Sequence, residues 1–232
     1  MRIVPAIVVW LFASMPTLAG GSDEVSDEAV ADGLKQVLTQ SASAAVEKLG
    51  VPNGFLGNPK VKIPLPGALQ KAEGVMRSFG INKYADGLIT TMNRAAETAT
   101  AEAGPLLLDA VQQLSAEDAR KILRGGNDAA TGHFRSSASD ELYQKFLPVV
   151  KSATDQAGVA KKYNEFAGKG AKFGLVGEKY ANIENYVTQK TLDGIYLLMA
   201  EEERAIRENP AQGGPIVESV SGLLKQSNEQ AQ

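Results

Sequence analysis

The stretch IENYVTQKTLDGIYLLMAEEERAIRENP, residues 183–210, decides the fold class of this chain. On a helical wheel its main apolar side chains fall within about 60° of one another: Leu192, Ile195, Met199 and Ile206. Pro210 cannot continue a helix, because it lacks a backbone N–H and restricts the residue before it. The sequence therefore predicts a long amphipathic helix from Ile183 to Glu208.

The same wheel places one carboxylate of this helix on its apolar face. Glu202 falls among the apolar side chains, whereas Glu201 and Glu208 fall on the opposite, charged face. We therefore predict that Glu202 is drawn into the core, where a carboxylate must be paired, hydrogen-bonded or protonated. A structural ion pair is the preferred interpretation, and a polar ligand pocket between helices is the alternative. The candidate partners are Arg94, Arg120 and Arg135.

The rest of the chain continues the helical pattern, with apolar residues at intervals of three and four. Further helices are predicted over Ser26–Leu49 and over about Asn82–Ala103, the second of them stopped by Gly104 and Pro105. The capping patterns SAED (115–118) and SASD (137–140) predict two more helix starts. The predicted fold class is all-α, a single body of about seven to nine helices.

Two segments do not fit a helix. The stretch GFLGNPKVKIPLPGAL (54–69) carries three prolines around alternating apolar residues, which predicts an extended Pro-rich strap laid along the helical body. The stretch GKGAKFGLVG (168–177) predicts a glycine-rich loop. It matches neither the Walker pattern nor the dinucleotide-binding fingerprint, the two glycine-rich motifs that bind phosphate groups. Pro148 predicts a kink or a break in the helix that follows Ser137.

A short motif recurs along the chain. ADGL occurs at 31–34 and 85–88, and a near copy, LDGI, occurs at 192–195. With SDEL included, the aspartates are 54, 54 and 53 residues apart: Asp32, Asp86, Asp140 and Asp193. This spacing predicts a weak repeat of about 54 residues, and chance matches between amphipathic helices are the alternative. A glycine within a helix costs roughly 1 kcal/mol relative to alanine, so we interpret these glycines as sites of close helix packing.

The first residues have the pattern of a secretory signal peptide. Arg2 precedes an apolar run over 3–12, and the small residues Thr17 and Ala19 fit a cleavage site. The run is too short to cross a bilayer, which needs roughly 20 apolar residues. We expect cleavage after Ala19, a periplasmic protein and no transmembrane segment in the mature chain. The expected parts are a signal peptide, a flexible N-terminus, a helical domain and a tail with a short amphipathic helix: residues 1–19, 20–27, 28–210 and 211–232.

The composition excludes several functional classes. The chain has 232 residues, 24 basic and 27 acidic side chains and a formal net charge of −3. This balance fits neither a nucleic-acid-binding protein nor a polybasic membrane anchor. Cysteine is absent and His133 is the only histidine, so the sequence predicts no metal site, no cofactor and no thiol nucleophile. We interpret His133 as structural or incidental, with a role as a general base as the alternative.

The string MNRAAE (92–97) offers another charged pair. Arg94 and Glu97 are three residues apart and point away from the apolar face of the predicted helix. We interpret them as a surface ion pair worth a few tenths of a kcal/mol, unless another helix covers that side.

Several strings together carry a family resemblance: NPKVKIPLP (58–66), MNRAAE (92–97), EDARKIL (117–123), DAATGHFR (128–135) and YVTQKTLDGIYLLMAEEERAIRENP (186–210). In them the chain resembles the exported bacterial proteins of domain-of-unknown-function family 4197, over about residues 28–210. The resemblance implies an exported or envelope-attached helical protein with no assigned activity, and it carries over no catalytic residues. Many relatives begin with a lipid-modified cysteine, which this chain lacks.

These features favour a non-catalytic binding or interaction protein of the cell envelope. We expect it to hold a small apolar ligand or a partner helix between its helices, or to bind an envelope protein, and self-association stays open. The alternative is a hydrolase-like or other enzyme of unrecognised class that uses buried carboxylates. The candidate ligand-binding residues are Glu202, Arg94, Arg120, Arg135, Tyr186 and Asp193.

Overall fold

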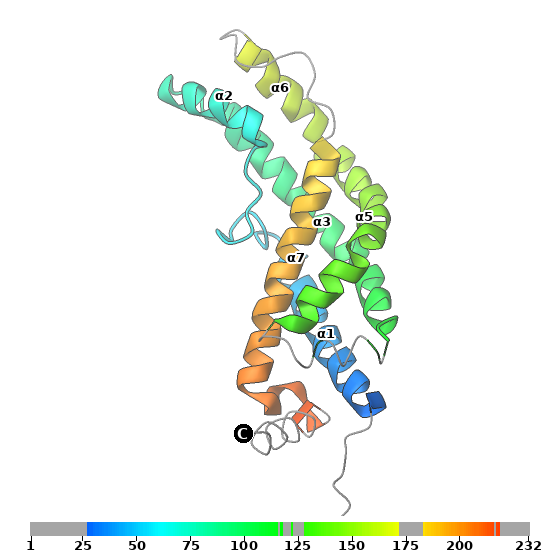
Figure 1. Ribbon diagram of the computed structural model, residues 1–232. Helices are drawn as coiled ribbons and strands as arrows, with labels where there is room; N and C mark the ends of the chain where they lie inside the picture. Colours follow the sequence, from blue (N-terminus) through cyan, green and yellow to red (C-terminus); the bar gives the residue numbers. More distant parts are fainter. Residues whose placement is uncertain are drawn as a thin grey trace, which may run out of the picture.

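The computed structural model describes residues 27–115, 128–171 and 183–215, together with 117, 122, 217 and 218. Over these residues the chain forms six α-helices and a short 3-10 turn, with no strand (Figure 1). The predicted all-α class is confirmed, although the described part holds fewer helices than the predicted number. The elements are α1 (Asp27–Leu49), α2 (Gly67–Ser78), α3 (Lys83–Gln112), α5 (Ala129–Ala157), α6 (Val159–Ala171), α7 (Ile183–Glu208) and η1 (Pro210–Gly213).

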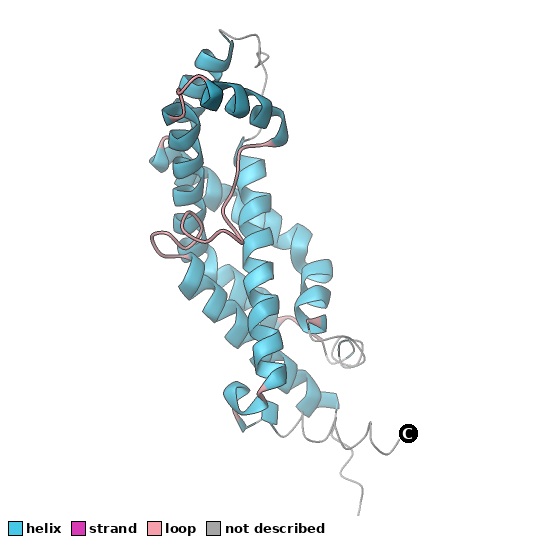
Figure 2. Cartoon of the chain, turned by 90° about the vertical axis from the view of Figure 1, so that its left-hand side faces the viewer, coloured by secondary structure: helices cyan, strands magenta, loops and turns pink. Residues whose placement is uncertain are grey.

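Helix α3 lies at the centre of the packing, because α1, α5, α6 and α7 all contact it. The result is an elongated helical body, with the long loop between α1 and α2 lying along its side (Figure 2). The main apolar core runs through it, and among its largest fully buried side chains are Leu88, Met92, Phe134 and Phe146. Burying each such side chain contributes about 1.5–3 kcal/mol, so the core itself supplies the main driving force. None of the described helices combines the length and apolar character needed to cross a membrane.

The sequence located α7 correctly, but it placed the end of α3 too early. Helix α3 continues through Gly104 and Pro105 to Gln112. Pro105 is exposed, and so is Ala101, the residue whose carbonyl loses its helical partner. Gly104 is buried against α1, where an added Cβ would lie 3.0 Å from Cγ1 of Val46. This glycine therefore marks a close approach of two helices, not a helix end.

The predicted helix start at SASD is also wrong. Helix α5 begins at Ala129 and contains residues 137–140 in its interior. The Ser137 hydroxyl donates to the carbonyl oxygens of His133, at 3.0 Å, and Phe134, at 3.3 Å, so it bonds back to the preceding turn instead of capping a new helix. Pro148 does not end α5, which continues to Ala157 and stops at Gly158 with φ +70°.

The segment between α1 and α2, residues 50–66, is held against α3 by a buried asparagine. We call this segment the α1–α2 loop. Asn93 is fully buried, and its side chain accepts a hydrogen bond from the Ile63 amide at 2.8 Å and donates to the Ile63 carbonyl at 2.9 Å. Asn93 thus satisfies both backbone groups of one loop residue, as a neighbouring strand would. Val61, Ile63 and Leu65 are buried, while Lys62 and Pro64 between them are exposed.

A buried carboxylate makes the second attachment of the same loop. Glu97 is 4% exposed and accepts hydrogen bonds from the amides of Phe55, at 3.2 Å, and Leu56, at 3.0 Å. Its other oxygen accepts a bond from Arg94 at 2.6 Å. The predicted Arg94–Glu97 pair is present, but its interpretation as a surface pair is wrong for Glu97. A loop, not another helix, covers that side of α3.

The motif glycines differ in their surroundings. At Gly194 an added Cβ would lie 2.7 Å from Cε1 of Phe55 and 3.3 Å from Cβ of Val61, whereas at Gly87 its nearest contact would be 3.6 Å from Lys162. Close packing therefore explains Gly194, although its neighbour is the α1–α2 loop and not a helix. The repeat of about 54 residues stays a prediction.

We predict that Gly194→Ala lowers the free energy of unfolding by about 1–3 kcal/mol, because the added Cβ forces the fully buried Phe55 ring to shift within the core. Gly132→Ala is the matched control, since a Cβ at Gly132 meets nothing within 4 Å. The control is expected to stabilise α5 by up to about 1 kcal/mol. Urea unfolding of both variants tests this contrast, and equal shifts in the same direction would refute it.

Some predictions lie outside the described residues. They concern the signal peptide (1–19), the helix start at SAED, Arg120 and the glycine-rich loop at 168–177, of which only 168–171 are described, as the end of α6. The predicted helix of the C-terminal tail lies largely outside them as well.

Candidate functional site

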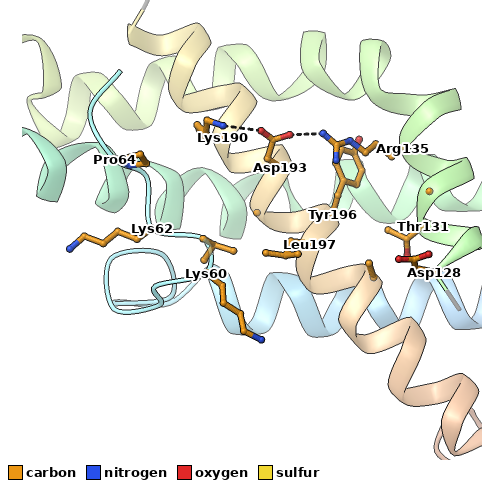
Figure 3. A pocket seen from close by; sticks show the side chains of 14 residues that line it. Lys60, Lys62, Pro64, Asp128, Thr131, Arg135, Lys190, Asp193, Tyr196 and Leu197 are labelled. Carbon is orange, nitrogen blue, oxygen red and sulfur yellow. Dashed lines mark hydrogen bonds and ion pairs between the residues drawn. The ribbon is translucent and has the colours of Figure 1, made fainter. Parts of the chain in front are cut away.

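A pocket of about 520 Å³ lies between the α1–α2 loop, the first turns of α5 and the middle of α7 (Figure 3). Its volume falls within the range of about 300–1,000 Å³ that is typical of small-molecule sites. All three elements supply charged side chains to its wall. The charged residues that line it are Lys60, Lys62, Asp128, Arg135, Lys190 and Asp193.

The position of α5 beside α7 depends on a buried glutamate. Glu203 is fully buried, and its oxygens accept hydrogen bonds from the amides of Ala130, at 3.0 Å, and Thr131, at 2.7 Å. The Thr131 hydroxyl adds a third bond at 2.7 Å. Amides in the first turn of a helix have no partner within the helix, and a negative charge is favourable there. Glu203 therefore caps α5 from a different helix, while Arg207 of its own helix donates to it at 2.9 Å.

This arrangement corrects the prediction for Glu202. The Glu202 side chain is 28% exposed and forms an ion pair with Lys48, so Glu203, and not Glu202, is the glutamate drawn into the core. The two positions border the same apolar face, and the wheel could not separate them. The deciding partners are the α5 amides, which belong to residues more than 70 positions away in the chain.

Two predicted site residues come together in the pocket. Arg135 donates to Asp193 at 2.7 Å, and Lys190 donates to the other oxygen of Asp193 at 3.3 Å (Figure 3). The Arg135 guanidinium also lies 5.4 Å from the centre of the Tyr196 ring. This stacking adds a cation–π attraction and restricts the guanidinium. One carboxylate is thus shared by two cations, one of them held over an aromatic face.

The Tyr196 ring forms part of the wall behind this ion group. Tyr196 is 3% exposed, and its ring packs edge-on against Phe134 with centroids 6.3 Å apart. Burial raises the pKa of the Tyr196 hydroxyl, and a weak contact of 3.4 Å with the Ser139 hydroxyl opposes this effect. The phenol is therefore protonated at neutral pH, so Tyr196 supplies an aromatic face and no negative charge.

The other predicted site residues lie elsewhere. The Tyr186 hydroxyl donates to the Pro64 carbonyl at 3.0 Å and so fastens the α1–α2 loop to α7. Arg94 donates to Glu97 and, at 2.9 Å, to Asn53. Neither residue lines the pocket, and Glu202 does not line it. Of the predicted residues that lie in the described part of the chain, the structure therefore brings Arg135 and Asp193 to this site.

Sequence reasoning missed the three lysines and the apolar surface that complete the pocket. Helix α7 presents four lining residues on one stripe, at spacings of three, four and three: Lys190, Asp193, Leu197 and Ala200. Such spacing keeps side chains on one helical face. Leu197 is 37% exposed, so the stripe presents apolar surface next to its charged residues. This exposed leucine beside charged residues is the signal that points to the site.

The charges of the pocket do not cancel. Four cations and two carboxylates line it, which leaves an excess of two positive charges. Lys60 pairs with Glu201 at 2.7 Å and Asp128 pairs with Arg204, so these two outer partners leave the excess unchanged. The hydrogen bond from Arg204 lowers the pKa of the Asp128 carboxyl, which keeps that residue ionised. The pocket therefore favours a negatively charged ligand.

The described residues contain no cluster of three or more His, Cys, Asp or Glu side chains that could hold a metal ion. His133 does not line the pocket. Its backbone carbonyl accepts bonds from the hydroxyls of Ser136, at 2.8 Å, and Ser137, at 3.0 Å.

Comparison with known proteins identifies the family of this sequence. A protein-family model described as "Protein of unknown function (DUF4197)" matches residues 24–222. No curated protein and no solved structure matches the chain. The match confirms the resemblance found in the sequence motifs, and it spans every residue that lines the pocket.

Proposed function

We propose that this chain, which belongs to the DUF4197 family, is an exported, non-catalytic binding protein. It binds a small ligand in the pocket between the α1–α2 loop, α5 and α7. The observation that carries the proposal is the pocket itself. It combines a suitable volume with charged groups that converge from three elements and with an exposed apolar surface on α7.

The supports of the pocket favour a preformed binding site. Asn93 and Glu97 hold the α1–α2 loop, and Glu203 holds the first turn of α5. These side chains are buried, so they fix the two walls on either side of α7. In this proposal the α1–α2 loop has the role of the Pro-rich strap expected from the sequence. A site that is formed in advance loses less conformational entropy when the ligand binds.

The state of the carboxylates favours binding over catalysis. Asp193 is shared by Arg135 and Lys190, and Asp128 is paired with Arg204. A general base or acid normally has a pKa brought near the working pH, and the pKa of Asp128 is shifted the opposite way. Glu202 and Tyr186 do not line the pocket: Glu202 pairs with Lys48, and the Tyr186 hydroxyl is bound to the backbone carbonyl of Pro64.

The signal-peptide pattern of residues 1–19 supports export to the periplasm. The ligand then comes from the envelope or from the surrounding medium.

Native mass spectrometry tests the proposal directly. The protein is purified gently from a periplasmic extract and compared with the same protein after denaturation and refolding. We expect an extra bound mass that refolding removes. The occlusion variant Gly132→Leu should lose that mass, because Gly132 lines the pocket and its Cβ position faces open space.

The matched control is Gly74→Leu. Gly74 also has open space at its Cβ position, but it lies in α2 and does not line the pocket. This variant should keep the bound mass. A bare protein from the extract, or a mass that Gly132→Leu retains, would contradict the proposal.

A further inference from the structure

The stripe that α7 presents to the pocket changes from charged to apolar along the helix, although Lys60 and Asp128, paired with Glu201 and Arg204, line the pocket beside its later part. Lys190 and Asp193 form the charged end of the stripe, and Leu197 and Ala200 form its apolar end. From Lys190 to Ala200 the stripe covers about 15 Å of helix. A ligand that lies along this stripe contacts charged side chains at one end and the apolar side chains of Leu197 and Ala200 at the other.

The charged end has room for another anion. Among the described residues, Asp193 is the hydrogen-bond acceptor that the structure gives to Arg135, although a guanidinium carries five N–H groups. Lys190 and Arg135 together bring two positive charges to one carboxylate. One positive charge is therefore left over at this end, and the Tyr196 ring holds the guanidinium in place. A planar guanidinium of this kind can bind a carboxylate or a phosphate through two parallel hydrogen bonds.

The apolar end of the stripe has exposed hydrocarbon. Leu197 is 37% exposed, whereas Leu198 next to it is 5% exposed. Val61 and Pro64 of the α1–α2 loop add apolar lining nearer to the charged end, where the Pro64 carbonyl accepts the hydrogen bond of Tyr186. Covering such surface with a hydrocarbon chain contributes about 25 cal/mol per Å². The pocket therefore offers a hydrophobic contribution in addition to the ionic one.

On the basis of the proposed function, we infer that the ligand is a single-chain amphipathic anion. Arg135 and Lys190 bind its carboxylate or phosphate head group, and its hydrocarbon chain lies along Leu197 and Ala200. The sequence led us to expect a small apolar ligand, and the pocket adds an acidic head group to that ligand. A cationic amphiphile of the same length would place its charge against Arg135 and Lys190, so it is disfavoured.

The test compares four twelve-carbon probes on the refolded protein, below their micellar concentrations, by isothermal titration calorimetry. The probes are dodecanoate, dodecyl phosphate, dodecanol and dodecyltrimethylammonium. We expect at least one of the two anions to bind at least about ten-fold more tightly than dodecanol, and the cation to bind more weakly than dodecanol. A preference between the two anions identifies the head group as a carboxylate or a phosphate.

Variants assign this selectivity to the ion group. Arg135→Gln and Lys190→Gln should each weaken binding of the anions about ten-fold and leave dodecanol binding unchanged. Lys151→Gln is the matched control, because it removes one positive charge from α5 at an exposed position outside the pocket. It should leave all four affinities unchanged.

The outcomes separate this inference from the proposed function. If dodecanol binds as tightly as both anions and Gly132→Leu abolishes that binding, the pocket is a ligand site but the anionic ligand class is wrong. If the cation binds most tightly, the ligand class is also wrong. If none of the probes binds, the inference of an amphipathic ligand is overturned, and the bound mass in the native spectrum then decides the proposed function by itself.

Discussion

Replacing Glu203 by alanine is expected to lower the free energy of unfolding by about 3–5 kcal/mol, a larger loss than we expect for Gly194→Ala or for Asn93→Ala. Glu203 is fully buried and accepts bonds from two α5 amides and from the Thr131 hydroxyl. Its removal leaves those donors without a partner and leaves Arg207, whose side chain is 24% exposed, without its counter-ion. Each buried group that loses its partner costs about 1–3 kcal/mol.

Glu202→Ala is the matched control, one residue away. Its partner Lys48 is 56% exposed, and exposed ion pairs contribute about 0–1 kcal/mol. Urea unfolding followed by circular dichroism measures both variants, and an unchanged dependence of the free energy on urea concentration would show that the denatured states are comparable. Equal losses in the two variants would mean that the assignment of the buried glutamate is wrong.

The hydrogen bonds of Glu203 to α5 stabilise the fold and also position part of the pocket wall. Thr131 and Gly132 line the pocket, and Glu203 positions the turn of α5 that contains them. Glu203→Ala is therefore expected to weaken ligand binding even though Glu203 does not line the pocket.

Replacing Asn93 by alanine is expected to lower the free energy of unfolding by about 2–4 kcal/mol, because two buried backbone groups lose their partner. The substitution removes the partner of the Ile63 amide and of the Ile63 carbonyl, and Ile63 is fully buried. An alternative partner from solvent requires the α1–α2 loop to move away from α3. We therefore expect faster hydrogen exchange at the Ile63 amide, beyond the effect on global stability.

Asn82→Ala is the control for this second experiment. Asn82 is exposed at the N-terminus of the same helix and its side chain makes no capping hydrogen bond, so the change should stay within about 0.5 kcal/mol. Hydrogen exchange monitored by NMR distinguishes the two effects. If the Ile63 amide exchanges at the same rate in Asn93→Ala as in the unmodified protein, the asparagine does not hold the loop.

The helical architecture followed from local patterns. The bounds of α7 and the all-α class depend on the periodicity of apolar residues and on Pro210, which are properties of neighbouring residues along the chain. The Arg94–Glu97 pair followed for the same reason, because residues three apart on a helix are neighbours wherever the helix lies.

Glycine and proline residues predicted the ends of helices less reliably than apolar periodicity predicted the helices themselves. Gly104, Pro105 and Pro148 are all accommodated inside helices, because packing against neighbouring helices stabilises a helix beyond its intrinsic propensity. The serine of SASD bonds back into its own helix, and the first turn of α5 is capped at the Ala130 and Thr131 amides by Glu203 of α7.

The candidate site depended on packing between distant segments. Periodicity shows that a glutamate of α7 borders the apolar face, but only the first turn of α5 selects Glu203 over Glu202. Likewise, the charges of Lys190, Asp193 and Arg135 are visible in the chain, but their convergence requires α5 to lie beside α7. Helix formation is governed by contacts within a few residues, whereas burial and ion pairing are governed by which helices meet. The tertiary structure decides which helices contact each other.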